Sequence, residues 1–371
     1  MVYPKRLQEG DTVGLVAPAS PITEERIALC VKALESLGLK VKVGQALARS
    51  GQIFQEMEEE KKRREGADRI QAKETKAEVA GTEGALVEET EQEGAAADGR
   101  LASWRQEDGV KGFLETGYLA GRPEDRAGDI SQMFADPKIK GVICAKGGYG
   151  SAQIMGYLDQ ETIRKNPKLF LGFSDITNLL ATLSQRWGIV AYHGPMPSSN
   201  MIDPPMDPYT AACLKEAIFT DWQELDFKNP EGKALETLSG GKASGRLTGG
   251  NVTVFARMTG TFYQTDTKDK ILFLEDVTEQ VPSIDMYITQ MENAGLFKGV
   301  KGILLGDFNE CEDRYCSAYP VEELLRDRFG AMGIPVLSGL GCGHRKTTAT
   351  LPMGAWCEMD ADRQSVRFLR R

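Results

Sequence analysis

Short apolar segments that alternate with amphipathic ones are the feature that most constrains the fold of this chain. Residues 13–16 (VGLV) predict a buried strand, residues 22–38 predict a helix that ends on a glycine, and residues 39–44 (LKVKVG) predict a second strand. A strand, a helix and a further strand in this order are typical of an α/β unit with a parallel sheet. We therefore expect the first part of the chain to be α/β.

The alternation returns after residue 112 and predicts a doubly wound N-terminal domain. Amphipathic and apolar segments alternate at residues 127–138, 139–145, 168–173 and 175–188, and IVAY at 189–192 adds a further strand. Repeated units of this kind favour a parallel sheet with helices on both faces. We place this domain at residues 1–200.

The second half of the chain has a different pattern. Residues 201–245 are rich in proline and polar residues and are expected to form a linker. Residues 246–371 contain the short apolar segments ILFLED, GILLGDF, IPVLSG and SVRFLRR but few long helices. They predict a smaller C-terminal domain that is mixed α/β and barrel-like. Two domains also suit 371 residues, since a domain typically has about 100 to 200.

Residues 51–112 are expected to be an insertion in the N-terminal domain. The segment is rich in Glu, Lys, Ala and Gly and poor in large apolar residues, so it can contribute little to a core. Between Gly51 and Val110 it holds 16 acidic and 9 basic residues, a net charge of −7 out of −9 for the whole chain. The composition favours a solvated insertion, part charged helix and part disordered. A regulatory or partner-binding arm is the alternative.

Composition argues against several classes of partner and cofactor. A net charge of −9 disfavours nucleic acid. We find no signal peptide and no run of about 18 apolar residues, so we expect a cytoplasmic protein that does not bind a membrane. Seven cysteines without CxxC spacing suit reduced thiols, and the only two histidines do not lie beside paired cysteines. We therefore expect no metal and no cofactor.

The junction KLFLGFSDITNLL is the most informative candidate for chemistry. An apolar strand stops at Gly172, and a helix starts directly after Ser174 and Asp175. A serine at such a turn projects from the carboxyl edge of the sheet, where the helix N-terminus can stabilise an oxyanion. The geometry suits acyl transfer with Ser174 as nucleophile. Alternatively, Ser174 or Asp175 only caps the helix, and Ile176 stands where a strict GxSxG motif has its second glycine.

A glycine-rich loop, KGGYGS at residues 146–151, also joins a strand to a helix. Its backbone N–H groups could approach a substrate oxyanion or carboxylate. A phosphate-binding loop is the competing interpretation, but the segment matches neither GxxxxGK[ST] nor GxGxxG.

A serine nucleophile needs a base and a carboxylate that orients it. His344 lies in a glycine-rich loop with few apolar neighbours, and we favour it over His193, which follows the strand IVAY. Glu275 ends the apolar strand ILFLE, where a carboxylate must be paired or functional. A structural salt bridge or a cap is the alternative role for Glu275, and Asp307 in GILLGDF is the rival acid.

At these residues the chain resembles the LD-carboxypeptidases, serine peptidases that include muramoyltetrapeptide carboxypeptidase and the microcin C immunity peptidases. The resemblance covers nearly the whole chain outside the insertion. It runs through GDTVGLVAPAS, GYLAGRPEDRAGDISQMFADPKIKGVICAKGGYGS, LGFSDITNLL, YHGPM, LTGGNVTVFARMTGT, ILFLEDVTEQVPSIDMYITQM, GILLGDFNEC and GHRKTTATLPMGA.

The resemblance implies a catalytic triad of Ser174, Glu275 and His344, formed in a cleft between the two domains. It further implies an oxyanion hole made by the backbone N–H groups of Asp175 and Gly148. With Lys146 and Tyr149, these residues are the candidates for oxyanion and substrate binding. Family members are commonly homodimers, and the murein-recycling branch releases the terminal D-alanine of a cytoplasmic muropeptide.

Two other functions stay open: a detoxifying peptidase of the microcin C type and a muropeptide-binding protein without activity. The chain departs from the family pattern at three places. Lys146 replaces the usual Arg before GGYG, the loop after His344 lacks a proline that is often present, and residues 51–112 are inserted. These departures bear on substrate preference more than on activity.

Overall fold

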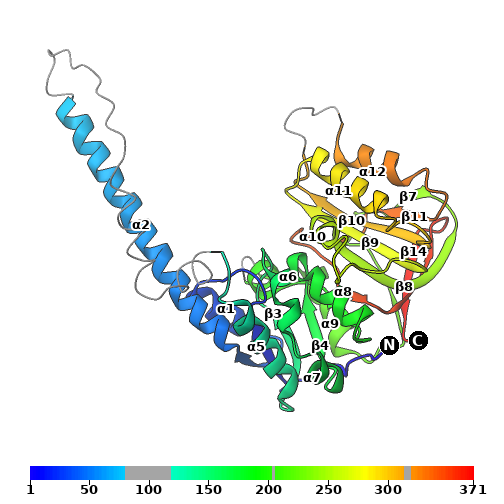
Figure 1. Cartoon of the computed structure of the whole chain (residues 1–371), viewed down its shortest axis with the longest axis horizontal. Coiled ribbons are helices and arrows are strands. Elements are labelled where there is room, and N and C mark those ends of the chain that lie inside the picture. The colour runs from blue at the N-terminus through cyan, green and yellow to red at the C-terminus, as the bar shows by residue number, and fades with distance from the viewer. Residues whose placement is uncertain (80–117, 203–204, 313–318) are drawn as a thin grey trace.

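Two β-sheets, one below the other in Figure 1, form the body of the molecule, and the chain termini lie near each other beside it. This computed structural model describes residues 1–79, 118–202, 205–312 and 319–371. A two-domain α/β fold, with an N-terminal parallel sheet and a C-terminal mixed sheet, is confirmed.

The N-terminal sheet has six strands in the order β12-β5-β4-β3-β1-β2. Five of them are parallel: β1 (Thr12–Val16), β2 (Lys40–Val43), β3 (Ile139–Cys144), β4 (Leu169–Gly172) and β5 (Ala191–His193). The helices between them are α1 (Glu24–Glu35), α5 (Pro123–Ala135), α6 (Ser151–Ile154), α7 (Gln160–Lys165) and α8 (Thr177–Gln185), with short 3-10 turns η1 (Met155–Tyr157) and η2 (Ser174–Ile176). Strands such as β4 are buried along their whole length because helices cover both faces of the sheet.

The C-terminal sheet has eight strands in an open order from β6 at one edge to β7 at the other. Between them lie β14 (Ser365–Leu369), β13 (Trp356–Asp360), β8 (Lys242–Asn251), β9 (Lys270–Val277), β10 (Gly302–Asn309) and β11 (Val336–Ser338). The neighbours from β8 to β11 are parallel, and the outer pairs are antiparallel. The mixed α/β character is therefore confirmed, although the described strands do not close into a barrel.

Alternation along β9 explains how this sheet is buried on both faces. Leu272 and Leu274 face the helices α10 (Val252–Arg257), α11 (Val281–Asn293) and α12 (Val321–Phe329), which lie on one side of the sheet in Figure 1. Ile271 and Phe273 point the opposite way and join the core that is continuous with the N-terminal domain. Successive strand residues point to opposite faces, so one strand serves both cores.

Residues 201–245, expected to be a linker, contain regular structure. They include α9 (Pro208–Phe219), β6 (Glu224–Asp226) and β7 (Glu236–Ser239), and the two strands are hydrogen-bonded into the C-terminal sheet at its edges. The position of the domain boundary stays a prediction.

One strand crosses between the domains. β12 (Leu351–Met353) lies in the C-terminal half of the sequence, yet it pairs antiparallel with β5 in the N-terminal sheet, with Leu351 opposite His193. The loop that contains His344 is thus held between β11 in one sheet and β12 in the other.

Helix α2 (Gln45–Val79) begins in the N-terminal domain and extends away from the body of the molecule. The expected insertion at residues 51–112 starts inside this helix, so its first part is helical as predicted. Residues 80–112, for which partial disorder was expected, lie outside the described residues.

A buried carboxylate from another helix caps the start of α2. Asp129 of α5 accepts hydrogen bonds from the backbone N–H groups of Gln45, Ala46 and Leu47. A side chain on Gly44 would put its Cβ 2.2 Å from Oδ2 of Asp129, so only glycine fits there. Burial raises the pKa of Asp129, although these three N–H groups oppose the shift.

We expect Asp129→Ala to lower the free energy of unfolding by about 2 kcal/mol, because three backbone N–H groups, two of them buried, lose their acceptor. Urea denaturation followed by circular dichroism measures this. Asp159→Ala is the matched control, since Asp159 caps the short helix α7 at an exposed position and should cost about 0.5–1 kcal/mol. Equal losses in the two variants would contradict a special role for the buried cap.

Candidate active site

Ser174 stands at a strained turn at the carboxyl end of β4. Its φ is 64°, in the left-handed region that residues with a Cβ rarely adopt. Ser174 is the first residue of the turn η2, which leads into α8, so it lies at the sheet edge where ligands bind in α/β folds. Its side chain is half-buried.

The capping role considered for Ser174 and Asp175 is not what the structure shows. Neither η2 nor α8 has a side-chain hydrogen bond at its N-cap. The Asp175 carboxylate instead accepts a hydrogen bond from the backbone N–H of Ser151 at 2.7 Å, and the Ser151 hydroxyl donates to the carbonyl oxygen of Asp175. These hydrogen bonds join the turn that contains Ser174 to the end of the glycine-rich loop. Burial raises the pKa of Asp175.

The glycine-rich loop lies directly against Ser174. A Cβ on Gly147 would be 2.9 Å from Cβ and 3.1 Å from Oγ of Ser174, and 3.5 Å from the backbone nitrogen of Asp175. Gly148 has a φ of 103°, and a Cβ there would be 2.1 Å from Oγ of Ser20. Close approach of the loop therefore requires glycine at both positions.

Two residues that the sequence analysis did not single out hold this loop. Ser20 accepts a hydrogen bond from the backbone N–H of Tyr149 and donates its own N–H to the carbonyl of Gly147. The guanidinium of Arg126, only 1% exposed, donates to the carbonyls of Pro18, Gly121 and Gly150 and to the side chain of Gln153. Burial lowers the pKa of Arg126 to about 10. The segment GYLAGRPEDR was part of the family resemblance, but nothing in its spacing indicated this role.

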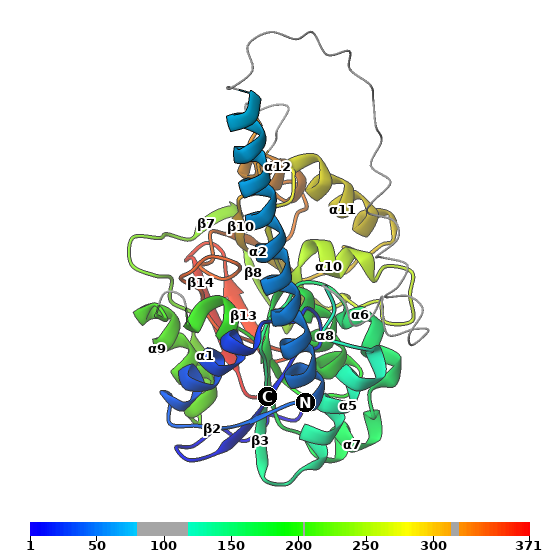
Figure 2. The same cartoon turned by 90° about the vertical axis from the view of Figure 1, so that its left-hand side faces the viewer.

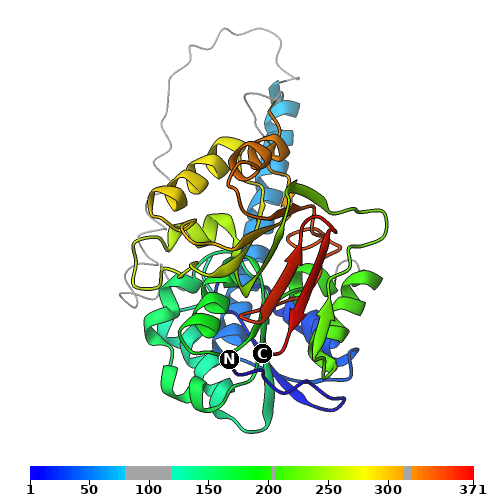
Figure 3. The ribbon, with the colours of Figure 1, turned by 90° about the vertical axis from the view of Figure 1, so that its right-hand side faces the viewer.

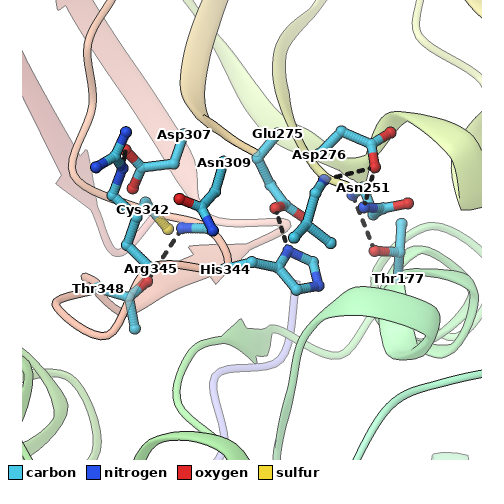
Figure 4. Close-up of polar contacts among 12 residues, drawn as sticks. Thr177, Asn251, Glu275, Asp276, Asp307, Asn309, Cys342, His344, Arg345 and Thr348 are labelled. Carbon is cyan, nitrogen blue, oxygen red and sulfur yellow. Dashed lines mark hydrogen bonds and ion pairs between the residues drawn. The ribbon is translucent and has the colours of Figure 1, made fainter. Parts of the chain in front are cut away.

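Glu275 and His344 form the hydrogen-bonded pair expected from the sequence. Nδ1 of His344 and Oε2 of Glu275 are 2.7 Å apart, and Figure 4 marks this contact with a dashed line. Glu275 lies in the buried part of β9 and is itself fully buried, whereas the His344 side chain is 14% exposed. Because the carboxylate accepts a hydrogen bond from Nδ1–H, Nε2 is the basic nitrogen, and it has no partner among the described residues.

The pKa of His344 is raised above its ordinary value of 6.5. Burial alone would lower the pKa, but the charge of Glu275 and its hydrogen bond to the ring together outweigh burial. The pair therefore stabilises an imidazolium, as a base that accepts a proton from a serine requires.

Phe173 links the turn that contains Ser174 to the His344–Glu275 pair. Its ring centroid is 4.8 Å from that of His344, so the residue that precedes Ser174 packs against the imidazole. The hydrogen bonds of the described residues do not include one between Ser174 and His344. Contacts of this kind are often long in an enzyme without substrate.

A second buried carboxylate, Asp276, follows Glu275 on β9. It accepts hydrogen bonds from the side chain of Asn251 and from the backbone and hydroxyl of Thr253. The backbone N–H of Asn251 in turn donates to the hydroxyl of Thr177 in the N-terminal domain, so this network crosses the domain interface (Figure 4). Burial, and then the charge of Glu275, raises the pKa of Asp276 to about 6.

The rival residues lie in other environments. His193 is fully buried between the rings of Phe173 and Phe273, neither of its nitrogens has a partner among the described residues, and burial lowers its pKa to about 4. Asp307 forms ion pairs with Lys233 and with Arg345 rather than with His344. These contacts favour the choice of His344 and Glu275.

Lys146 and Tyr149, the other candidates for substrate binding, are both exposed. They flank Gly147 and Gly148 on the loop that meets Ser174. No helix in the described part of the chain is both long enough and apolar enough to cross a membrane.

Family models match both domains of the chain. The LD-carboxypeptidase N-terminal domain matches residues 87–194, and the LD-carboxypeptidase C-terminal domain matches residues 244–359. A probable murein peptide carboxypeptidase of Bacillus subtilis is 32% identical over 359 residues, which cover 96% of this chain and 91% of the relative.

Two solved structures have the same fold. The microcin C7 self-immunity protein without ligand gives a TM-score of 0.76 at 20% identity, over 100% of this chain and 99% of that one. Muramoyltetrapeptide carboxypeptidase from Oxalobacter formigenes gives a TM-score of 0.70 at 21% identity, over 97% and 99%. From the domain matches and the full-length relative, the chain belongs to the LD-carboxypeptidase family.

Proposed function

We propose that this protein is a cytoplasmic serine carboxypeptidase that releases the terminal D-alanine from murein tetrapeptide by cutting an L,D peptide bond. The observation that carries the proposal is the hydrogen bond between His344 and Glu275. The His344 ring packs against Phe173, which directly precedes Ser174. The name of the Bacillus subtilis relative supports a murein peptide as substrate.

In the acylation step, Nε2 of His344 takes the proton of the Ser174 hydroxyl while Oγ attacks the scissile carbonyl carbon. Glu275 stabilises the imidazolium that forms. The tetrahedral intermediate then collapses, the C–N bond breaks, and His344 gives its proton to the amine nitrogen of D-alanine. The tripeptide stays bound to Ser174 as an ester.

The negative charge on the carbonyl oxygen needs donors that are already in place. The backbone N–H groups of Gly148 and Asp175 are the proposed donors, since a group placed on Gly147 would meet both Ser174 Oγ and the nitrogen of Asp175. Arg126 and Ser20 position this loop through their bonds to it.

In the deacylation step, water takes the place of the amine. His344 removes a proton from the water, the resulting hydroxide attacks the ester carbon, and the proton returns to Oγ of Ser174. The products are the tripeptide and D-alanine, and the enzyme is restored.

A substrate panel tests the proposal. The full chain is incubated with free tetrapeptide, with muramoyl tetrapeptide, with the same tetrapeptide ending in L-alanine, and with an aminoacyl-nucleotide conjugate. We expect tripeptide and D-alanine from the first two only, detected by mass spectrometry. Cleavage of the conjugate alone would support the microcin-type alternative, and binding without cleavage would support a muropeptide-binding protein.

A homodimer is also proposed from the family resemblance. Sedimentation equilibrium of the full chain should give twice the chain mass of 40.7 kDa. A mass that stays at one chain over the accessible concentrations would contradict it.

The pH profile should report the His344–Glu275 pair. We expect kcat/KM to rise with pH through the pKa of His344, which lies above 6.5, because only the neutral imidazole accepts the serine proton. Glu275→Gln removes the charge that raises the pKa of His344, while the burial that lowers this pKa remains. The rise in kcat/KM should therefore move to lower pH, and the rate should fall about 10²- to 10⁴-fold.

Assays between about pH 5 and pH 9 measure both effects. Asp307→Asn is the comparison variant: Asp307 is a buried carboxylate on the neighbouring strand with other partners, and its charge raises the pKa of His344 less than Glu275 does, so the midpoint should move less. An unchanged midpoint in Glu275→Gln would contradict the pairing.

A further inference from the structure

Lys146 is a cation one residue away from the loop position that contacts Ser174. It follows β3 and directly precedes Gly147, whose missing side chain leaves room for Ser174. Consecutive Cα atoms are about 3.8 Å apart, so the side chain of Lys146 starts one residue from the point where the loop touches Ser174. The long side chain of Lys146 therefore starts beside the position where Ser174 would attack a carbonyl.

A second cation, Arg26 of α1, is tied to the same segment. Its Nη2 donates to the carbonyl of Ser198 at 2.7 Å and its Nε to the Ser198 hydroxyl at 3.3 Å. Ser198 belongs to the single-turn π-helix η3 (Pro197–Met201) and donates its own N–H to the carbonyl of Ala145 at 3.1 Å. Ser198 thus holds Arg26 against the residue that precedes Lys146.

These two cations are not neutralised by the protein. Neither Lys146 nor Arg26 forms an ion pair with a carboxylate in the described ranges, whereas Lys233 and Arg345, also near His344, share Asp307. Desolvation by the surrounding protein, together with the charge of Arg26, lowers the pKa of Lys146. Two cations held together without an anion favour an anionic ligand between them.

We propose that Lys146 and Arg26 form the receptor for the terminal carboxylate of the peptide substrate. This inference rests on the proposed function and deepens it. In a C-terminal residue the carboxylate is attached to the carbon that carries the scissile nitrogen, so it lies only a few bonds from the carbonyl that Ser174 attacks. A cation that binds this carboxylate selects the last peptide bond of the substrate, so the enzyme cleaves as an exopeptidase.

The test compares tetrapeptide that has a free terminal carboxylate with the same peptide ending in a carboxamide. We expect the wild-type protein to prefer the carboxylate. Lys146→Met should lower kcat/KM on the carboxylate peptide about 10- to 100-fold, mainly through KM, and should leave the carboxamide peptide within about twofold. Lys146→Arg should restore most of the preference, and added salt should weaken it.

Lys140→Met is the matched control, because Lys140 is an exposed lysine at the other end of the same strand. If Lys146→Met lowers kcat/KM equally on both peptides, or on neither, the proposed carboxylate receptor is wrong. The affinity of Ser174→Ala for the two peptides, measured by calorimetry, provides a second readout. If the wild-type protein shows no turnover, tighter binding of the carboxylate peptide that depends on Lys146 would still support the carboxylate receptor. It would then contradict only the proposed hydrolase activity. Equal affinities would overturn the receptor even if hydrolysis occurs.

Discussion

Ser174→Ala is expected to reduce D-alanine release about 10⁴- to 10⁶-fold, because the variant has no oxygen that can form the acyl-enzyme. The fold should persist, since alanine and serine have the same Cβ and tolerate a φ of 64° equally badly. Discontinuous assays with chromatographic detection of D-alanine measure the loss. Ser36→Ala, at an exposed serine that bonds only to its own helix, should keep full activity.

Ser174→Gly tests separately what the Ser174 hydroxyl contributes to turnover and what the strained backbone at this position costs in stability. Glycine adopts a positive φ freely, so this variant should be inactive yet more stable than the wild-type protein by about 1 kcal/mol. A gain in stability together with complete loss of turnover would show that the strained backbone is retained for function. Residual turnover in Ser174→Ala near the wild-type rate would rule out the proposed nucleophile.

His344→Ala is expected to lower kcat by a similar factor, about 10⁴- to 10⁶-fold, because the part of the chain that the structure describes places no other base to accept the serine proton. Loss of the imidazole also leaves the buried Glu275 carboxylate without its partner, so a fall in stability of about 1–3 kcal/mol should accompany it. Steady-state kinetics and thermal denaturation of the same samples measure the two effects.

His193→Ala is the control for His344 and should be only partly impaired. His193 is buried against Phe173, so its removal disturbs the packing behind Ser174 without removing a proton acceptor. If His193→Ala were inactive and His344→Ala nearly normal, the choice between the two imidazoles would be wrong.

Much of the fold could be predicted because the inner strands β1, β3 and β4 of the N-terminal sheet are mostly apolar and end at a glycine or a loop. Parallel strands covered on both faces require this pattern. The local sequence pattern also predicted that Ser174 stands where a strand turns into a helix. In the structure β4 ends at Gly172, and only Phe173 separates it from the turn η2.

Contacts between distant segments could not be predicted from local pattern. Glu275 and Asp307 end similar apolar stretches of the neighbouring parallel strands β9 and β10, and only the path of the later loop decides that His344 meets the first. The edge strands β6 and β7 are short and polar, so nothing in their composition distinguishes them from a linker. The cap of α2 depends on Asp129, which lies 84 positions away from Gln45.

Strand β12 has a consequence for how the protein is made. The N-terminal sheet lacks its edge strand until residues 351–353 have left the ribosome, because β12 alone covers the outer side of β5. A nascent chain that ends near residue 200 would expose the unpaired backbone of β5, a surface prone to pairing with other chains. We therefore expect such truncated chains to aggregate or to recruit chaperones, and full-length synthesis to end with a late docking step.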